Sequence, residues 1–161
     1  RAHRKLAELE QAGTLSAVVT QNIDGLHQKA GSERVLELHG SVLRNFCMDC
    51  GAAYPVDELL RLRDEAADGV PRCPACGGIV KPDVVLYEEA LDEHTLQASV
   101  DAIARADLLV VAGTSLAVYP AAGLIDFFQG DHLVIVNRTP TPRDRQADLC
   151  IAANVGEVFG F

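Results

Sequence analysis

The protein has 161 residues, the length of one ordinary domain or of one larger domain with a small insert. Apolar residues make up 48% of the chain and charged residues 23%, as in globular domains, so a disordered or low-complexity chain is excluded. The 23 acidic residues outnumber the 14 basic ones, and the formal net charge of −9 argues against nucleic acid or an anionic membrane as a partner.

The apolar runs of the sequence are all short. The longest, 108–113 and 133–136, fall far below the roughly 20 residues that a membrane-spanning helix needs. Residues 1–9 alternate charged and apolar side chains and lack the apolar stretch of a secretion signal. We therefore expect a cytoplasmic protein.

The N-terminal part of the chain predicts one helix and two short strands. Leu6 and Leu9 share a helical face, and Gly13 supplies a helix stop. Residues 17–20 form a β-branched run suited to a buried strand, and 35–38 predict a second strand that ends at His39. Polar residues follow both strands directly.

Residues 44–82 differ in character from the rest of the chain. They contain four cysteines and four prolines, and only one helix is expected there, near residues 57–67. After this segment, strands alternate again with helices. We expect strands at 84–87, 108–112, 133–136 and 149–152, and helices at 96–104 and 121–128.

This alternation predicts an α/β fold with a doubly wound, parallel, Rossmann-like sheet. The sheet domain would comprise residues 1–43 and 83–161. Residues 44–82 would form a small insert within it.

Four of the five cysteines form two Cys-x-x-Cys pairs. Cys47 and Cys50 are separated by 22 residues from Cys73 and Cys76. Two tight chelating turns predict a closed tetrahedral zinc site with a structural role, with two disulfides or free thiols as the alternatives. Cys150 stands alone in an apolar run, where we expect a buried, inert thiol.

Four polar clusters stand where predicted strands end, at residues 21–24, His39, 113–115 and 137–139. In a doubly wound sheet, ligands bind beyond the carboxyl ends of the strands. Each cluster alone has a structural explanation: Asx turns, a hydrogen-bonded core histidine or helix N-caps. The order of the four clusters along the chain is more informative than any one of them alone.

Together with the four cysteines, these clusters resemble the sirtuins, the NAD-dependent protein deacylases, along nearly the whole chain. The other matching segments are 20–27 with 30–31, 37–40, 81–89, 113–116 with 119–121, and 135–137. Most family members end the 81–89 segment with Phe-Gly-Glu, whereas this chain has Tyr87-Glu88 in place of Phe-Gly.

The resemblance implies removal of an acyl group, with acetyl as the expected case, from protein lysine, giving nicotinamide and O-acyl-ADP-ribose. His39 matches the catalytic base, which acts on a ribose hydroxyl. Asn22 and Asp24 match catalytic positions, and Asp24 resembles the acceptor for the nicotinamide carboxamide.

The same resemblance implies three sets of binding residues besides the zinc ligands. Those for NAD are Gln21, Asn22, Ile23 and Asp24 at the nicotinamide and its ribose, Gly113, Thr114, Ser115 and Asn137 at the adenosine, and Asn154 and Val155 beside the adenine. An acyl-lysine peptide would lie as an added strand between Val84, Val85, Leu86, Tyr87 on one side and Val118, Tyr119 on the other.

Family members carry, before the helix that begins this sequence, a strand and a Gly-Ala-Gly loop for the pyrophosphate, and neither is found here. We therefore expect an N-terminally truncated form without measurable activity of its own. Two other functions stay open. A zinc-ribbon interaction module is disfavoured because residues 41–82 carry five basic and six acidic side chains, and a non-catalytic nucleotide-binding domain because His39 and Asp24 are both present.

Overall fold

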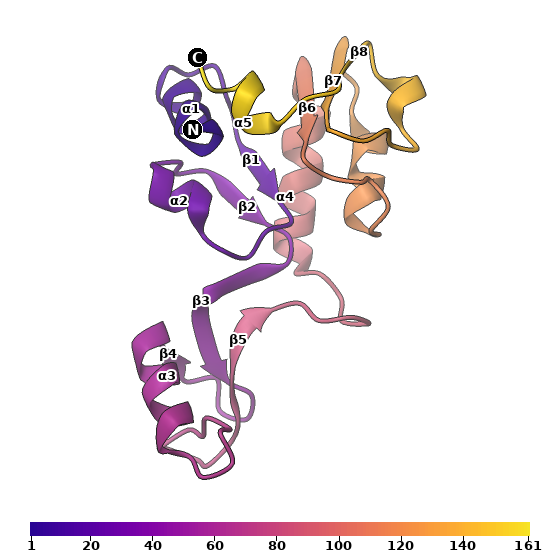
Figure 1. Ribbon diagram of the computed structural model, residues 1–161. Coiled ribbons are helices and arrows are strands. Elements are labelled where there is room, and N and C mark those ends of the chain that lie inside the picture. The colour runs from indigo at the N-terminus through magenta and orange to yellow at the C-terminus, as the bar shows by residue number, and fades with distance from the viewer. The chain divides into compact units, whose positions relative to one another are not determined.

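The computed structural model describes residues 1–161, which divide into two compact units. The first unit comprises residues 1–19, 26–38 and 92–161, and the second comprises residues 20–25 and 39–91. Figure 1 shows the helices and strands of both units. None of the helices combines the length and the apolar character that a membrane span requires.

The predicted N-terminal helix is present as α1 (Ala2–Gln11), and it buries Ala7. It ends before Gly13, whose φ of +74° is a conformation that glycine adopts without strain. Two short helices, α2 (Leu26–Ala30) and α5 (Val155–Val158), contact α1. These three helices therefore pack together although they come from both ends of the chain.

The long helix α4 (Glu93–Ala104) has a well-formed N-cap. The Asp92 carboxylate accepts hydrogen bonds from the Thr95 backbone N–H and from the Thr95 hydroxyl, both at 2.8 Å. A capping aspartate satisfies helix donors that would otherwise lack a partner. Ser99 and Ile103 are buried, and α4 contacts β2 (Val35–Glu37) and the 3-10 helix η1 (Ala121–Phe127).

The parallel sheet of the first unit has the strand order β6 (Leu108–Ala112), β7 (His132–Val136), β8 (Leu149–Ile151). Val111 pairs with Ile135, which pairs in turn with Cys150. Buried apolar side chains on and beside this sheet form a cluster: Leu116, Ile125, Leu133 and Ile135. A second short 3-10 helix, η2 (Asp144–Gln146), precedes β8.

The predicted α/β class with a parallel sheet is confirmed, but the strands do not form one continuous sheet. β1 (Val18–Thr20) and β2 pair with each other in a two-stranded sheet that is separate from β6–β7–β8. β6 is consequently an edge strand, and Leu108 and Val110 on it are exposed.

The second unit contains a three-stranded antiparallel sheet with the order β4 (Ala53–Tyr54), β3 (Gly40–Cys47), β5 (Val80–Val84). The helix α3 (Val56–Glu65) contacts β3. Cys47, Leu62, Cys73 and Val80 form its buried cluster. The unit reaches beyond residues 44–82 on both sides because β3 pairs with β5 along its length.

The structure corrects one predicted strand and refines one predicted helix. The strand expected at 84–87 is wrong, because the strand observed is β5 and residues 85–87 lie outside it. Pro82 lies within β5, which is an edge strand, where proline is tolerated. The helix expected at 121–128 is the 3-10 helix η1.

Candidate functional site

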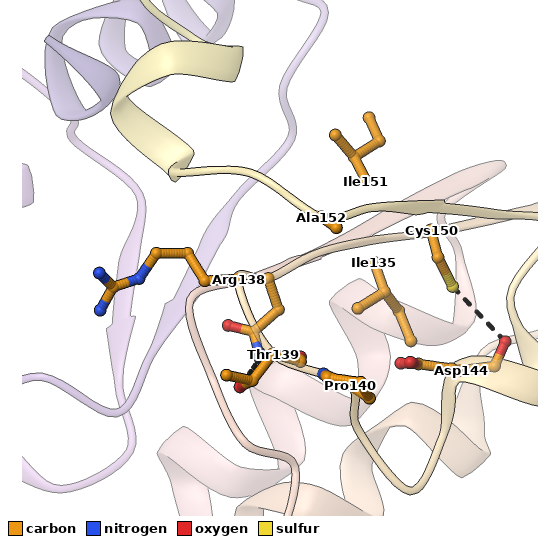
Figure 2. Close-up of a pocket in the computed structure, with 9 residues that line it drawn as sticks. Ile135, Arg138, Thr139, Pro140, Asp144, Cys150, Ile151 and Ala152 are labelled. Atoms are coloured by element: carbon orange, nitrogen blue, oxygen red, sulfur yellow. Dashed lines mark hydrogen bonds between the residues drawn. The ribbon is translucent and has the colours of Figure 1, made fainter.

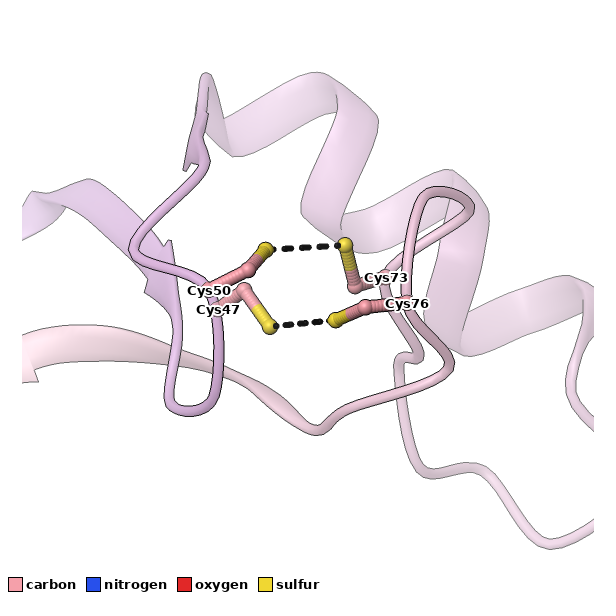
Figure 3. Close-up of side chains that lie close together, drawn as sticks. All are labelled: Cys47, Cys50, Cys73 and Cys76. Atoms are coloured by element: carbon pink, nitrogen blue, oxygen red, sulfur yellow. Dashed lines mark hydrogen bonds between the residues drawn. The ribbon is translucent and has the colours of Figure 1, made fainter.

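The four paired cysteines of the second unit direct their sulfur atoms toward one another (Figure 3). Cys47 Sγ lies 3.4 Å from Cys76 Sγ, and Cys50 Sγ lies 3.6 Å from Cys73 Sγ. All four sulfurs lie within 4.8 Å of one another, and none forms a disulfide. A tetrahedron of thiolates at about 2.3 Å from zinc has sulfur separations of about 3.8 Å. The cluster is therefore positioned to bind one zinc ion and to fill its coordination.

The two cysteine turns have the same backbone geometry. The Gly51 N–H donates to the Cys47 carbonyl at 3.0 Å, and the Gly77 N–H donates to the Cys73 carbonyl at 2.8 Å. Both glycines have positive φ angles, +72° and +78°, which other residues adopt only with strain. The glycine after each pair thus closes the turn that presents the two sulfurs.

Tyr54 on β4 adds a contact that the sequence did not predict. Its hydroxyl donates a hydrogen bond to Cys73 Sγ at 3.0 Å. This hydrogen bond lowers the pKa of the Cys73 thiol to about 6. Zinc binds the thiolate form, so the tyrosine favours the state that the metal requires. Its only signal in the sequence was its position between the two cysteine pairs.

His39 lies at the end of the segment that leads into β3, and its ring is half-buried. Its Nδ1 lies 2.9 Å from the backbone carbonyl oxygen of Gln21. A carbonyl can only accept, so Nδ1 carries the ring proton and Nε2 holds the free lone pair. The geometry therefore makes Nε2 the basic nitrogen of His39.

The polar loop 21–24 belongs to the same unit as His39. The Asn22 N–H donates to Thr20 Oγ1 at 3.1 Å, and the Ile23 carbonyl accepts from the Val42 N–H at 3.0 Å. These bonds attach the middle of the loop to β1 and β3. The side chains of Asn22 and Asp24 are exposed, while Gln21 and Ile23 are half-buried.

Gly40 allows β3 and β5 to approach each other beside His39. It has a φ of +76°, and a Cβ at this position would overlap the carbonyl oxygen of Asp83. The neighbouring His39 carbonyl accepts from the Val85 N–H at 3.1 Å. The structure thus brings the predicted base next to the predicted peptide-binding segment, of which Leu86 and Tyr87 are exposed.

A cavity of about 290 Å³ lies in the first unit beyond the carboxyl ends of β6 and β7. Its lining consists of Gly113, Asn137, Arg138 and residues 153–156. Four predicted cofactor residues therefore meet here: Gly113, Asn137, Asn154 and Val155. Thr114 and Ser115 follow Gly113 in the chain but do not line the cavity.

Hydrogen bonds hold the cavity walls in place. The Gly113 N–H donates to the Val136 carbonyl at 3.0 Å, and the Asn137 N–H donates to the Ile151 carbonyl at 3.1 Å. The Asn137 side-chain amide donates to the Thr139 carbonyl at 2.9 Å, which leaves its Oδ1 to accept from a ligand.

A second, smaller cavity of about 80 Å³ lies beside the first and includes Ile135, Asp144 and Cys150 in its lining (Figure 2). Cys150 Sγ contacts the Asp144 carbonyl oxygen at 3.6 Å. The expectation of a buried thiol is wrong, because Cys150 is exposed. β8 is an edge strand, so no neighbouring strand covers this side of the sheet.

Val118 and Tyr119, the other predicted peptide-binding residues, are exposed in the first unit. Arg143 reaches the Tyr119 hydroxyl at 3.4 Å. Its guanidinium also makes two hydrogen bonds to the Asp126 carboxylate, at 2.7 and 2.8 Å. This contact between η1 and the loop after β7 supports Tyr119 and was not predicted.

A model of the Sir2 family matches residues 1–120. The chain belongs to the Sir2 family. A Sir2-family relative from Clostridium perfringens, named NAD-dependent protein deacetylase, is 57% identical over 160 residues, which are 99% of this chain and 64% of that protein. A protein of the same name from Cutibacterium acnes is 56% identical over 157 residues, which are 98% of this chain and 62% of that protein.

Solved Sir2 structures have the same fold as this chain. A structure described as "Sir2-p53 peptide-NAD+" has a TM-score of 0.93 and 41% identity, covering 99% of this chain and 66% of that one. Another, "Sir2 bound to acetylated peptide", has a TM-score of 0.94 and 40% identity, covering 99% and 67%. The chain spans less than two thirds of the length of the curated relatives named above.

Proposed function

We propose that this protein removes acyl groups, with acetyl as the expected case, from protein lysine in an NAD-dependent reaction that yields nicotinamide and O-acyl-ADP-ribose. The observation that carries the proposal is the hydrogen bond between His39 Nδ1 and the Gln21 carbonyl, at 2.9 Å. It orients a basic nitrogen beside the loop predicted to hold nicotinamide. The names of the relatives, which include deacetylase, and of the solved structures, which include NAD and acetylated peptide, support the same activity.

In this proposal, His39 is the general base. Its Nε2 takes the proton from a ribose hydroxyl, while Nδ1–H stays bonded to the Gln21 carbonyl and fixes the ring. A neutral imidazole is the side chain suited to accept a proton near neutral pH. The bonds that attach loop 21–24 to its strands keep that orientation during the reaction.

The proposed NAD site has two parts. NAD, when bound, supplies the ribose carbon whose bond to nicotinamide breaks. Asp24 would accept from the carboxamide N–H of nicotinamide, and Asn22 would contact the ribose, with Gln21 and Ile23 completing the loop. The adenosine part of the site would comprise Gly113, Thr114, Ser115, Asn137, Asn154 and Val155, four of which line the 290 Å³ cavity.

The proposed peptide site uses exposed backbone and apolar side chains. An extended acyl-lysine peptide would pair with residues 84–87 and 118–119. The exposure of Leu86, Tyr87, Val118 and Tyr119 supports this role. Residues 85–87 are not part of β5, but the Val85 and Leu86 N–H groups already donate to the His39 carbonyl and to the Glu89 carboxylate, so a peptide strand would pair with the remaining backbone groups of this segment.

The proposal extends to the domains, the partners and the location of the protein. Residues 44–82 are the zinc-binding insert, with a structural metal, and residues 1–43 with 83–161 form the NAD-binding part. The net charge of −9 supports acyl-lysine proteins as partners over nucleic acid or membrane. The cytoplasm is the proposed location.

Because the chain as given is expected to lack measurable activity, the test uses a form extended at its N-terminus to the length of its relatives. It compares this extended wild type with His39→Ala and with the control His94→Ala, which changes an exposed histidine at the start of α4. Nicotinamide release from NAD is measured with an acetyl-lysine peptide. We expect His39→Ala to lower turnover by roughly 10² to 10⁴-fold and His94→Ala to leave it within twofold. NAD binding without any turnover in the extended wild type would indicate a non-catalytic nucleotide-binding domain.

A further inference from the structure

We propose that Glu88, together with the ring of Tyr87, recognises a positively charged side chain close to the acylated lysine, so that the enzyme prefers acyl-lysine segments that carry arginine or a second lysine. This inference rests on the proposed function, because it takes residues 84–87 as one wall of the peptide site. It adds the charge of the substrate to what that site selects.

Residues 86–89 form a tight turn shortly after β5 ends. The Glu89 N–H donates to the Leu86 carbonyl at 3.1 Å, and the Glu89 carboxylate accepts from the Leu86 N–H at 2.8 Å. The ammonium group of Lys81, on β5, lies 4.0 Å from the same carboxylate. These contacts hold the two ends of the turn together, so Tyr87 and Glu88 stand at its tip.

The backbone of Glu88 has a conformation that the turn requires and that a glutamate does not favour. Its φ is +71°, and Leu116 is the only other residue besides the glycines with a positive φ. Turns with positive φ at the third position favour glycine or asparagine there, because a longer side chain strains this conformation. The turn itself therefore does not explain the glutamate, and a strained residue that the fold does not need points to a role in binding.

The carboxylate of Glu88 has no partner within the protein. The side chain is exposed and makes no hydrogen bond or ion pair. The cations of the adjoining strands are engaged elsewhere: Arg44 donates to the Asp83 carboxylate at 3.0 Å, and Lys81 donates to the Val84 carbonyl at 3.2 Å. The tip of the turn therefore presents a negative charge that no side chain of this unit neutralises.

Tyr87 places an aromatic ring next to this charge. The side chain is 99% exposed, so its ring faces water. The face of an aromatic ring attracts a guanidinium or ammonium group, and a carboxylate accepts hydrogen bonds from the same groups. A long basic side chain is the chemistry that suits both residues, whereas an acidic side chain would be repelled by Glu88.

The place of the turn indicates where in the substrate this cation lies. The proposed peptide would run as a strand along residues 84–87, and a strand rises about 3.3 Å per residue. The turn follows the same segment, so we expect the recognised cation within about three residues of the acyl-lysine. The net charge of −9 also favours a basic segment over an acidic one.

The experiment uses zinc-loaded protein, extended at its N-terminus as above, and acetyl-lysine peptides with alanine at the other positions. A single arginine, glutamine or glutamate is placed in turn at each of the three positions on either side of the acetyl-lysine. The measurements are kcat/KM for nicotinamide release and peptide affinity by fluorescence anisotropy without NAD. At one position or more, we expect arginine to exceed glutamine by about 3- to 10-fold and glutamate to fall below it, with the difference shrinking as salt is added.

Two variants of Glu88 separate recognition from folding. Glu88→Gln and Glu88→Gly should both reduce the preference for arginine to about twofold or less, and Tyr87→Leu should reduce it in part. Glu88→Gly should unfold at the same urea concentration as wild type or a higher one, because glycine adopts the positive φ without strain. The control Asp57→Asn, which changes an exposed carboxylate in the first turn of α3 in the same unit, should keep the preference.

Equal kcat/KM and equal affinity for the arginine, glutamine and glutamate peptides would overturn the inference and leave the proposed deacylation intact. A preference for arginine that persists in both Glu88 variants would overturn it as well, because another group would then recognise the cation. Binding without turnover still decides the point, since the affinities carry the same comparison. If the extended protein neither binds nor deacylates any of the peptides, the proposed function fails and the inference fails with it.

Discussion

The Tyr54 hydroxyl lies 3.0 Å from Cys73 Sγ, although the two residues are 19 positions apart in the chain. Cys73 is buried at 2% exposure, so its sulfur has little access to water as a hydrogen-bond donor. The tyrosine supplies that donor, and it lowers the pKa of the Cys73 thiol to about 6. A hydrogen bond to a metal-binding sulfur both orients the ligand and favours its ionised form.

We therefore predict that Tyr54→Phe weakens zinc binding. Removal of an outer-shell partner typically costs 10- to 100-fold in metal affinity, and we expect a loss in that range. Competition with a chromogenic zinc chelator measures it. Tyr87→Phe is the control, because Tyr87 lies in the same unit and is 99% exposed. Equal affinity of Tyr54→Phe and wild type would show that the hydrogen bond does not act on the metal site.

We expect one zinc ion per chain in protein purified without chelator. Removing it should unfold the region around α3, because Cys47 and Cys73 belong to the buried cluster with Leu62 and Val80. Bound structural zinc stabilises small modules strongly, and four unliganded thiols would leave this cluster poorly packed. Elemental analysis and amide hydrogen exchange before and after chelation provide the measurements.

Cys47→Ser and Cys150→Ser form a matched pair for this prediction. Cys47→Ser should abolish stoichiometric zinc, whereas Cys150→Ser should retain it, because Cys150 lies outside the cluster. A zinc content near zero in the wild type would refute the assignment of the four cysteines.

Gly40→Ala should destabilise the second unit more than Gly69→Ala. Both glycines have positive φ, +76° and +68°, so both substitutions carry a similar backbone strain of about 1–2 kcal/mol. Only at Gly40 would the new Cβ overlap another group, the Asp83 carbonyl, while Gly69 has open space. We expect an additional loss of about 1–3 kcal/mol for Gly40→Ala.

Urea unfolding of the zinc-loaded protein checks this prediction. Equal midpoints and slopes for the two variants would mean that β3 and β5 can separate at Gly40 without loss. If Gly40→Ala also lowers turnover, His39 has moved with the strand that follows it.

Arg143→Ala should raise the KM for an acetyl-lysine peptide while NAD⁺ affinity stays within twofold. The guanidinium holds Asp126 with two hydrogen bonds and supports the Tyr119 hydroxyl, and Arg143 does not line the proposed adenosine cavity. Loss of this support lets a predicted peptide-binding side chain move. Steady-state kinetics with varied peptide, and calorimetry with NAD⁺, both on the N-terminally extended protein, separate the two effects.

The control for this prediction is Arg105→Ala, which removes an exposed arginine after α4. The variant Arg143→Lys should restore the peptide KM only partly, because an ammonium group cannot reproduce the two parallel hydrogen bonds. An unchanged peptide KM in Arg143→Ala would show that Tyr119 does not depend on this contact.

The sequence was sufficient for features that depend on local spacing. Two Cys-x-x-Cys-Gly turns present paired sulfurs because the chain closes over four residues, so the zinc cluster was predictable from Cys47 to Cys76. The apolar runs at 108–112 and 133–136 also predicted strands of the parallel sheet, because a short continuous apolar run is itself a local feature of the sequence. Polar residues after those strands were placed at one edge by the rule that parallel strands end together.

Only the tertiary structure decided the contacts between residues that are distant in the chain. The tautomer of His39 depends on the Gln21 carbonyl, and the thiol of Cys73 depends on Tyr54, because strand pairing and turn geometry determine which groups meet. Cys150 lies in an apolar run but is exposed, since its strand is at the edge of the sheet. Apolar composition shows that a strand suits burial, whereas its place in the sheet determines which of its side chains are covered.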